Sequence, residues 1–470
     1  MPELVVSPSA PGALPVPDMT AHSATSLPHI TTRAAAEARH WSAPTRVAFR
    51  FCFVYFGLYV LTTQMLPGML PIPGVNIPDL GSLSVVQAPV VWFGAHVLQL
   101  PNPISLAPSG SGDRMFDWVL ALQTLIVAAI TTIVWSVRSP CSTSHARLYK
   151  WFRFFMRWAL ATTMLSYGFA KVIPLQMPVL TLTKLVEPYG DFSPMSVLWN
   201  FIGSSAPYEV FIGCAEVFAG ALLFWTRTTL FGIIVTLMDA IGIFALNMTY
   251  DVPVKLFSLH LILLSLVLLA PNIRTLYALL FLQQAAVPIR EPALGRSAAG
   301  ERRWTTLQVG FGTYCMLAMF VGSVIAWNKY GGGAATSPLF GIWSVNVSIS
   351  DGILQPPLLT DSSRFRHVIF QRKELATMQK MDQRLLTYFT AVDTVAHTLT
   401  LTAANTRKSP TDTAHAKPTF VYQRVSKDSL ILDGDLNGHR LHLGLSLRPH
   451  EKFPQLSRGF HWIQQNPLNR

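Results

Sequence analysis

The apolar residues of the chain are gathered into long runs between residues 42 and 327, whereas charged residues recur in every short window from residue 338 onward. A helix that crosses a membrane needs roughly 20 mainly apolar residues. Runs of about this length predict about seven spans, at residues 47–65, 116–137, 152–173, 208–225, 229–247, 253–270 and 306–327. We therefore expect a polytopic α-helical membrane bundle followed by a domain of a different kind.

Two further apolar runs are predicted not to cross the membrane. The first, residues 83–100, is broken by Pro89, and the second, residues 276–287, has about 12 residues, fewer than a crossing needs. We expect the first run to lie on the outer face or to re-enter the membrane. The second is predicted to form an interfacial helix in a cytoplasmic linker, residues 273–305.

Basic residues are concentrated in every second connection between the predicted spans. The connections on one side contain Arg33, Arg39, Arg46, Arg50, Arg138, Arg147, Lys150, Arg153, Arg227, Arg274, Arg290, Arg296, Arg302 and Arg303. Those on the other side contain little more than Arg114 and Lys184. Because cytoplasmic loops are enriched in Lys and Arg, we expect the protein in the cytoplasmic (inner) membrane. Its N-terminus is predicted to lie in the cytoplasm and its C-terminal domain outside.

Composition agrees with this class. Half of the residues are hydrophobic and 13% are charged, against roughly 25% in soluble domains. The formal net charge of +12 follows mostly from the basic connections on one side, and no nucleic-acid-binding motif is present. We expect membrane lipids as partners and no nucleic acid.

The region 338–470 reads as a β-rich domain. Alternation or enrichment in β-branched and aromatic residues predicts strands at 341–349, 364–371, 385–392, 398–402, 419–425, 429–432 and 440–446. Turn-prone residues separate them at 350–352, 433–435 and 437–438. Short strands at this spacing predict an antiparallel β-barrel or sandwich.

Ionisable residues inside the spans are the candidate functional groups, because such residues are costly in a membrane and usually face the bundle interior. Glu216, Asp239 and His260 each lie about seven to nine residues from the outer end of a span, which places them roughly 10–14 Å below the outer surface. Their equal depth predicts one polar cluster. A second layer at the outer rim is predicted to form ion pairs and contains Lys171, Glu209, Asp251 and Lys255, while Arg157 lies near the cytoplasmic end of the core.

Helical spacing supports this grouping. One stripe on the third span contains Arg157, Ala161, Met164, Gly168 and Lys171, and another on the fourth contains Glu209, Gly213, Glu216 and Gly220. Small residues on a stripe allow close helix approach. The stripes are compatible with structural ion pairs that lock the bundle, with a proton-coupled site for a lipophilic redox molecule, and with lipid or cargo binding.

Local spacing suggests simpler roles for two aspartates. Asp251 precedes Pro253 and is predicted to cap the sixth span, and it lies four residues before Lys255, a spacing at which the two can pair. Asp113 is predicted to cap the second span. Both assignments are structural.

The cysteines form no CxxC pair, which argues against a thiol enzyme of the vitamin K reductase type; they are Cys52, Cys141, Cys214 and Cys315. The chain also contains no ligand set for haem, flavin or an iron–sulfur cluster. His439, His442 and His461 lack the tight spacing of a metal site. We expect no covalently bound cofactor and no metal.

The motifs of the third and fourth spans resemble the DoxX family of four-helix membrane proteins. They are Arg157-Trp followed by Tyr167-Gly-Phe-Ala-Lys171, and Glu216-Val-Phe-Ala-Gly220-Ala-Leu-Leu followed by Thr226-Arg227. The resemblance implies a four-helix core at residues 152–272. It also implies a link to quinone, since the best-known family activity is that of the membrane subunit of a thiosulfate:quinone oxidoreductase. Residues 43–151 would add two transmembrane helices with a long outer loop, and residues 306–327 a seventh span.

The C-terminal domain begins with Gly341-Ile-Trp343, which is similar to the Gly-x-Trp motif that opens lipocalin-like barrels. The resemblance implies that Trp343 closes the base of such a barrel. The aromatic and basic segment at 458–470 is predicted to plug the barrel or to dock on the membrane face. Residues 1–42, rich in Pro, Ala, Ser and Thr, are predicted to be a disordered cytoplasmic arm.

Two functions are compatible with these features. The first is a component of a membrane oxidoreductase that interacts with quinone through Glu216, Asp239 and His260. Its electrons would come from a partner, such as a soluble redox protein, or pass directly to the substrate. The second is a non-enzymatic envelope protein, whose bundle anchors an extracytoplasmic domain that binds a lipid or a partner protein. Whether the protein is an enzyme stays open at this point.

Overall fold

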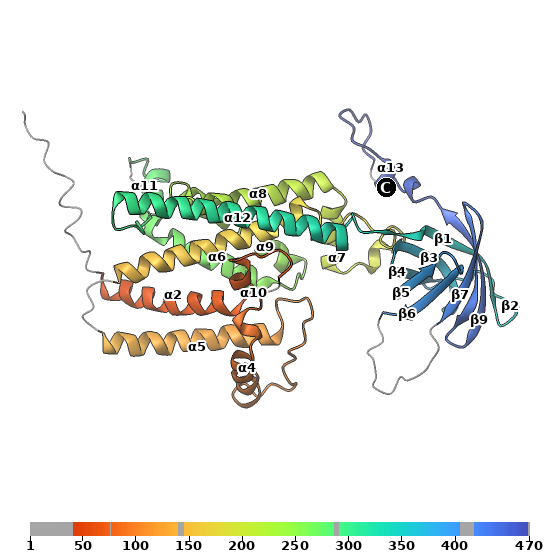
Figure 1. The fold of residues 1–470 in the computed structure, drawn as a ribbon, viewed down its shortest axis with the longest axis horizontal. Helices are drawn as coiled ribbons and strands as arrows, with labels where there is room; N and C mark the ends of the chain where they lie inside the picture. Colours follow the sequence, from red (N-terminus) through yellow and green to blue (C-terminus); the bar gives the residue numbers. More distant parts are fainter. Residues whose placement is uncertain (1–40, 76, 140–144, 286–290, 405–417, 469–470) are drawn as a thin grey trace, which may run out of the picture.

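The computed structural model describes residues 41–75, 77–139, 145–285, 291–404 and 418–468. The predicted N-terminal arm lies outside these residues except for its last two, Trp41 and Ser42. Figure 1 shows a helical bundle and a β-barrel arranged end to end. We call the end of the bundle that faces the barrel the barrel side, and the opposite end the far side.

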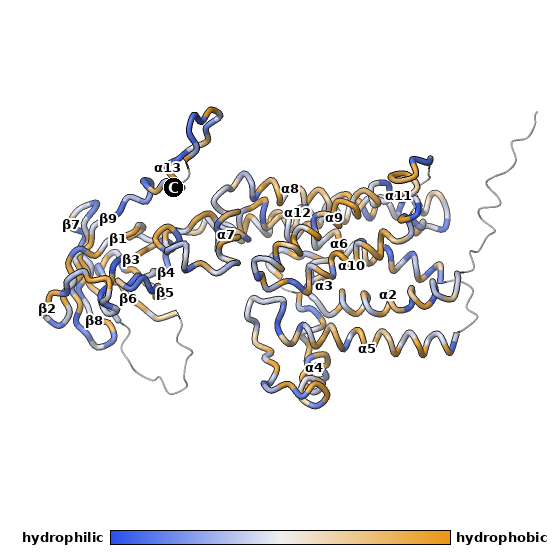
Figure 2. Tube along the Cα trace, turned by 180° about the vertical axis from the view of Figure 1, so that it is seen from behind, coloured by the Kyte–Doolittle hydropathy of each residue, from blue (hydrophilic) through white to orange (hydrophobic). Residues whose placement is uncertain are grey.

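Seven long helices run between the two ends of the bundle (Figure 1). They are α2 (Ala43–Thr62), α5 (Met115–Arg138), α6 (Ala146–Val172), α8 (Ala206–Phe224), α9 (Thr229–Thr249), α10 (Lys255–Leu269) and α12 (Ala298–Tyr330). Within the described ranges, six segments are long and apolar enough to cross a membrane: these helices without α6, with α10 extended to Leu280. The predicted polytopic bundle is therefore confirmed. Figure 2 shows that hydrophobic residues predominate along these helices, whereas hydrophobic and hydrophilic residues are mixed along the barrel strands.

Helix α6 is the central element of the bundle. It is 27 residues long and carries five basic residues, so it is less apolar than its neighbours. It is nevertheless largely buried from Phe152 to Lys171, where it packs against α8 and also contacts α2, α10 and α12. A helix enclosed by other helices can carry charged residues because they face protein rather than lipid.

The two short apolar runs do not cross the bundle, as predicted. The first forms α4 (Ser84–His96), which contains Pro89, lies across the direction of the long helices in Figure 1 and packs on the start of α5. The second forms α11 (Ile273–Leu280), which follows the 3-10 turn η3 (Ala270–Asn272) and has no buried residue. The other short helices are α3 (Met65–Gly68), η1 (Leu80–Ser82), η2 (Tyr189–Asp191) and α7 (Pro194–Gly203).

The predicted stripes of α6 and α8 face each other. All nine of their residues are buried, including the ionisable ones. A Cβ atom added to Gly168 would lie 2.8 Å from the backbone nitrogen of Val217, and one added to Gly213 would lie 2.7 Å from that of Val172. The glycines therefore let the two backbones touch, which brings the charged residues of the same stripes together.

We expect Gly168→Ala to destabilise the bundle by about 1–3 kcal/mol, because the new methyl group forces main-chain atoms of α6 and α8 apart. Thermal unfolding of the purified protein in lipid nanodiscs measures the effect. Gly310→Ala in α12 is the matched control, since open space surrounds that position, and it should be neutral or raise helix stability by up to about 1 kcal/mol. Equal unfolding temperatures for the two variants would contradict the close approach.

The C-terminal domain is a closed antiparallel barrel of eight strands. Its strands are β1 (Thr336–Ser350), β3 (Phe365–Arg372), β4 (Leu375–Lys380), β5 (Leu385–Asp393), β6 (Thr398–Ala403), β7 (Thr419–Ser426), β8 (Ser429–Leu436) and β9 (His439–Arg448). Each pairs with the next, and β1 also pairs with β9 to close the barrel, while the short β2 (Ile353–Leu354) pairs only with the end of β1. The structure thus selects the barrel over the sandwich.

Two details of the strand prediction were wrong. Strand β4 was missed, because its residues are mostly polar or small although Ala376 and Met378 face the barrel interior. The predicted turn at residues 433–435 instead continues β8, where Gly434 lies so close to β7 that a Cβ atom would meet the backbone oxygen of Thr419 at 2.4 Å. The turn at Asn437-Gly438 is confirmed, with positive φ angles of 54° and 84°.

The barrel interior is filled by side chains. Trp343 is completely buried, and its indole Nε1 donates a hydrogen bond of 2.8 Å to the backbone oxygen of Leu339. Apolar side chains around Phe370, Leu401 and Phe420 leave no room for a water molecule between them. This part of the barrel interior is therefore tightly packed. The chain after β9 passes through α13 (Pro454–Ser457). The described part of the predicted segment, residues 458–468, is exposed and lies outside the barrel, so it does not plug the barrel (Figure 1).

The barrel is attached to the bundle at two places. Helix α12 leads directly into β1, and residues 181–187, which follow α6, dock on the outer face of the barrel. The backbone nitrogen of Leu182 donates to Oε1 of Gln371 at 2.9 Å, and Leu182 packs between Ile342 and Ile369. The barrel therefore lies on the side where α6 ends and where α7 begins.

Candidate functional site

A buried ion pair lies between α6 and α8. The ammonium nitrogen of Lys171 contacts both carboxylate oxygens of Glu216, at 2.6 and 2.9 Å, and both side chains are buried. Lys171 was predicted at the outer rim and Glu216 in the deeper cluster, so the structure joins the two predicted layers. The pair forms because Gly168 and Gly213 let the helices approach.

Asp239 of α9 completes the charged end of a cavity that also contains Lys171 and Glu216. The cavity has a volume of about 550 Å³, and the rest of its lining is mainly apolar. The Oδ2 atom of Asp239 is buried and has no hydrogen-bond partner among the described residues. A buried acceptor without a partner is uncommon, and this one is available to a donor in the cavity. We call this space the lipid-facing cavity.

The lipid-facing cavity lies between α6, α8, α9 and α10, with α7 at its barrel side. Leu198, Trp199 and Ile202 of α7 contribute to its lining. Its rim includes Met238, which is 70% exposed on the outer surface of α9, and Tyr208, also exposed. Since α9 is long and apolar enough to cross a membrane, we expect this rim to face lipid.

His260 lies elsewhere, so the prediction of one cluster formed by Glu216, Asp239 and His260 was wrong for the histidine. Its Nε2 is 2.8 Å from the hydroxyl oxygen of Tyr55, and its ring stacks on Tyr59 with centroids 3.7 Å apart. Its Nδ1 lies 2.7 Å from the backbone oxygen of Leu256. Because that oxygen only accepts, Nδ1 carries a hydrogen, and the neutral ring accepts from Tyr55. His260 therefore faces α2, away from the cavity.

Glu209 was predicted to form an ion pair at the outer rim, but its carboxylate binds the backbone instead. Its Oε1 accepts a hydrogen bond of 3.1 Å from the backbone nitrogen of Met177, and its Oε2 is buried with no partner among the described residues. Within that part of the chain, no salt bridge joins it to Lys171, which pairs with Glu216. Glu209 thus fixes the segment that connects α6 to α7.

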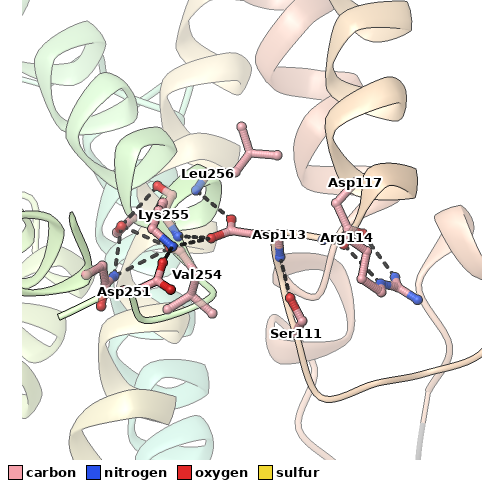
Figure 3. Close-up of polar contacts among 10 residues, drawn as sticks. Ser111, Asp113, Arg114, Asp117, Asp251, Val254, Lys255 and Leu256 are labelled. Atoms are coloured by element: carbon pink, nitrogen blue, oxygen red, sulfur yellow. Dashed lines mark hydrogen bonds and ion pairs between the residues drawn. The ribbon is translucent and has the colours of Figure 1, made fainter. Parts of the chain in front are cut away.

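The predicted pair between Asp251 and Lys255 is present, with a distance of 2.7 Å. The capping role assigned to Asp251 belongs to Asp113 (Figure 3), whose carboxylate accepts from the backbone nitrogens of Lys255 and Leu256 at 2.7 and 2.9 Å. Asp113 therefore caps α10 from another part of the chain rather than capping α5. Sequence spacing could not reveal this, because 142 residues separate the partners.

The start of α5 is capped by its own residues. The Asp117 carboxylate accepts a hydrogen bond of 3.0 Å from the backbone nitrogen of Arg114 and forms an ion pair of 3.0 Å with its guanidinium (Figure 3). The hydrogen bond to Asp117 raises the pKa of the Arg114 guanidinium above its ordinary value. Both residues line a second cavity of about 570 Å³ between α2, α5 and α10, which was not predicted from the sequence.

Arg157 lies toward the far side of α6, the end that was predicted to be cytoplasmic. Its guanidinium donates to Oγ1 of Thr229 at 3.1 Å and to Oε1 of Gln308. These bonds join α6 to α9 and α12, so Arg157 holds the bundle together at the end opposite to the cavity.

In the barrel, His439 and His442 pair with Asp351 and Asp433 at 2.7 and 2.6 Å.

Comparison with known proteins yields one short similarity. The uncharacterized protein YwoB of Bacillus subtilis (strain 168) is 29% identical over 119 residues, which cover 23% of this chain and 70% of the relative. No family model matches the chain, and no solved structure matches it. Since the relative is itself uncharacterized, the functional argument depends on the geometry of the cavity.

Proposed function

We propose that the protein is a quinone-interacting component of a membrane oxidoreductase system, with the quinone bound in the lipid-facing cavity. The observation that carries this proposal is the placement of Lys171, Glu216 and Asp239 at one end of an otherwise apolar cavity that faces lipid. Ionisable groups inside a membrane bundle are costly and mark sites where ligands or protons are handled. The DoxX resemblance of residues 152–272 favours the same ligand class.

The lining matches the parts of a quinone. A quinone has an apolar tail, a flat ring and two carbonyl oxygens, which become hydroxyl groups on reduction. The ammonium group of Lys171 supplies a hydrogen-bond donor for a carbonyl, and Oδ2 of Asp239 supplies an acceptor for a hydroxyl. Tyr167 and Trp199 line the same cavity and are suited to pack against a ring.

The barrel is proposed to serve as a docking domain. Its packed interior counts against the alternative in which it carries a lipid. It lies at the same end of the bundle as α7, which borders the cavity, so a soluble redox partner that docks there can supply electrons near the bound quinone. With the basic residues as guide, we place the far side in the cytoplasm and the barrel outside the cytoplasmic membrane.

The test is quinone binding by the full chain in lipid nanodiscs, with ubiquinone-1 as the probe. We expect saturable binding of ubiquinone-1. For its reduced form, ubiquinol-1, Asp239→Asn should raise Kd about tenfold, which corresponds to about 1.4 kcal/mol, because a neutral amide oxygen accepts a hydrogen bond from a hydroxyl group more weakly than a carboxylate does. Tryptophan fluorescence quenching or calorimetry measures Kd.

Asp428→Asn is the matched control, because Asp428 is exposed in the turn between β7 and β8. It should bind ubiquinol-1 as the unmodified chain does. An unmodified chain that shows no saturable binding, or an Asp239→Asn variant with the same Kd as the control, would reject the proposed site.

A further inference from the structure

The second cavity, about 570 Å³ in volume, differs from the lipid-facing cavity in its chemistry and in its opening. Hydroxyl, amide and charged groups make up much of its lining, among them Thr63, Gln64, Asp79 and Arg114. Gln64 and Gly110 at its rim are exposed on the barrel side of the bundle. This space therefore opens toward water beside the barrel rather than toward lipid. We call it the polar vestibule.

One layer of side chains separates the two cavities. Tyr167, Val254 and Phe257 line both the polar vestibule and the lipid-facing cavity. Val254 and Phe257 are apolar, so Tyr167 is the member of this partition that carries a polar group. Its hydroxyl group accepts a hydrogen bond of 3.0 Å from Nε2 of Gln64, and its ring centre lies 5.8 Å from the ammonium nitrogen of Lys171.

From this geometry we infer that the polar vestibule is a water-filled inlet through which protons reach the lipid-facing cavity. Tyr167 separates the two spaces and passes protons from one to the other through its hydroxyl group. The inference rests on the proposed function in one respect, namely that the protons are used to reduce a bound quinone. The inlet itself depends only on the two cavities and on the partition between them.

Two observations indicate that water fills the vestibule. Its volume of about 570 Å³ is large compared with the roughly 30 Å³ that one water molecule takes up in the liquid. Its lining also carries the charged groups of Asp79 and Arg114 and the amide of Gln64, and a polar space of this size holds water molecules that hydrogen-bond to such groups.

The wall of the vestibule next to Phe257 is held in place by two contacts, of which the cap made by Asp113 is drawn in Figure 3. The backbone nitrogen of Gly112 donates to the backbone oxygen of Pro253 at 2.8 Å, and Asp113 caps α10 beside it. These bonds tie the loop before α5 to the start of the helix that carries Phe257. The vestibule therefore has a fixed wall on the partition side.

The electrons and protons of quinone reduction can be accounted for with Tyr167 as the proton donor. Reduction of a quinone takes up two electrons, which the soluble redox partner supplies in the proposed function, and two protons, which form the two new O–H bonds. For each proton, the Tyr167 hydroxyl gives its hydrogen toward the lipid-facing cavity and receives another from water in the vestibule. Because Gln64 donates to the hydroxyl oxygen, the hydroxyl hydrogen is free for this transfer, and Tyr167 is unchanged after each cycle.

The inlet is tested by thiol labelling of the full chain in nanodiscs, after replacement of all four native cysteines by alanine. Thr63→Cys reports on the vestibule and Met164→Cys on the lipid-facing cavity, and the probe is the charged reagent MTSES. We expect the Thr63→Cys thiol to react at least about tenfold faster than the Met164→Cys thiol. Adding Tyr167→Ala should bring the Met164→Cys thiol to a similar rate, while Tyr167→Phe should leave it protected.

Phe257→Ala, on the same partition, is the second variant if Tyr167→Ala does not give a monodisperse protein. A vestibule thiol as slow as the cavity thiol would show that the vestibule is dry and would overturn the inlet. If the Met164→Cys thiol reacts at the same rate with and without Tyr167→Ala or Phe257→Ala, Tyr167 does not separate the two cavities, and this role is overturned. Neither outcome depends on quinone binding, so the inlet and the proposed function can fail separately.

The proton transfer has its own readout in Tyr167→Phe, which keeps the ring and removes the hydroxyl group. Kd for ubiquinone-1 should stay unchanged, while the rate at which a chemical reductant converts the bound quinone to quinol should fall about 10- to 100-fold. A packing role alone would leave this rate as it is. Equal rates for the two proteins would overturn the transfer through Tyr167.

Discussion

Lys171→Met is expected to lower the free energy of unfolding of the bundle by about 3–5 kcal/mol, the usual effect of removing one partner of a buried ion pair. The variant leaves the Glu216 carboxylate in a site where its side chain is only 2% exposed. Methionine fills a similar volume, so the loss reflects the unpaired charge rather than a cavity. Thermal unfolding in lipid nanodiscs measures the change.

The double variant Lys171→Met, Glu216→Gln is the matched control for this prediction. It removes both charges at once, and replacing a whole buried pair is often close to neutral, so most of the lost stability should return. If the single variant is as stable as the unmodified protein, the pair is not a structural element of the bundle. If the double variant is no better than the single one, the loss comes from packing.

Trp343→Ala is expected to destabilise the barrel by about 3–5 kcal/mol, because truncation of a buried aromatic side chain leaves a large cavity. The indole is completely buried and donates to the backbone oxygen of Leu339, which then loses its donor. Hydrogen exchange of the barrel strands in the full chain, followed by mass spectrometry, measures the local free energy of opening.

Trp462→Ala is the matched control, since this tryptophan is 91% exposed beyond β9. It should leave exchange of the barrel strands unchanged. The exchange of the helices should stay the same in both variants if the barrel opens independently of the bundle. Protected strands in Trp343→Ala would show that the indole is not a core residue of the barrel.

Tyr167 lies between two cavities of the bundle, the lipid-facing cavity and the polar vestibule. On one side of Tyr167, a charged end in an apolar space faces lipid, and on the other side a polar space faces water beside the barrel. A membrane protein that reduces a lipophile needs both kinds of access, since the lipophile arrives through the membrane and the protons come from water. The partition at Tyr167 is where the two routes meet in the proposed mechanism.

The sequence determined the elements whose signal is local. Apolar runs of sufficient length predicted the membrane helices, and alternation predicted most strands of the barrel. The stripes on α6 and α8 were also predicted correctly, because the spacing of Gly168, Lys171, Gly213 and Glu216 fixes which face of each helix they share. Small residues on both faces then required the helices to approach closely, and so brought Lys171 and Glu216 within reach of each other.

Only the tertiary structure showed which face of each helix packs against which neighbouring helix. Glu216 and Asp239 line one cavity as members of the predicted cluster, whereas His260 points in another direction. His260 turns toward Tyr55 and Tyr59 because α2 packs on that side of α10.

The cap of α10 by Asp113 and the partition at Tyr167 join segments far apart along the chain. A sequence pattern carries the period of one helix and its capping residues, whereas the rotation of that helix against its neighbours depends on all the contacts of the folded bundle. The helix faces that carry Lys171 and Glu216 could therefore be predicted from the sequence, whereas the pairing of these two residues, the two cavities and the residue between them could not.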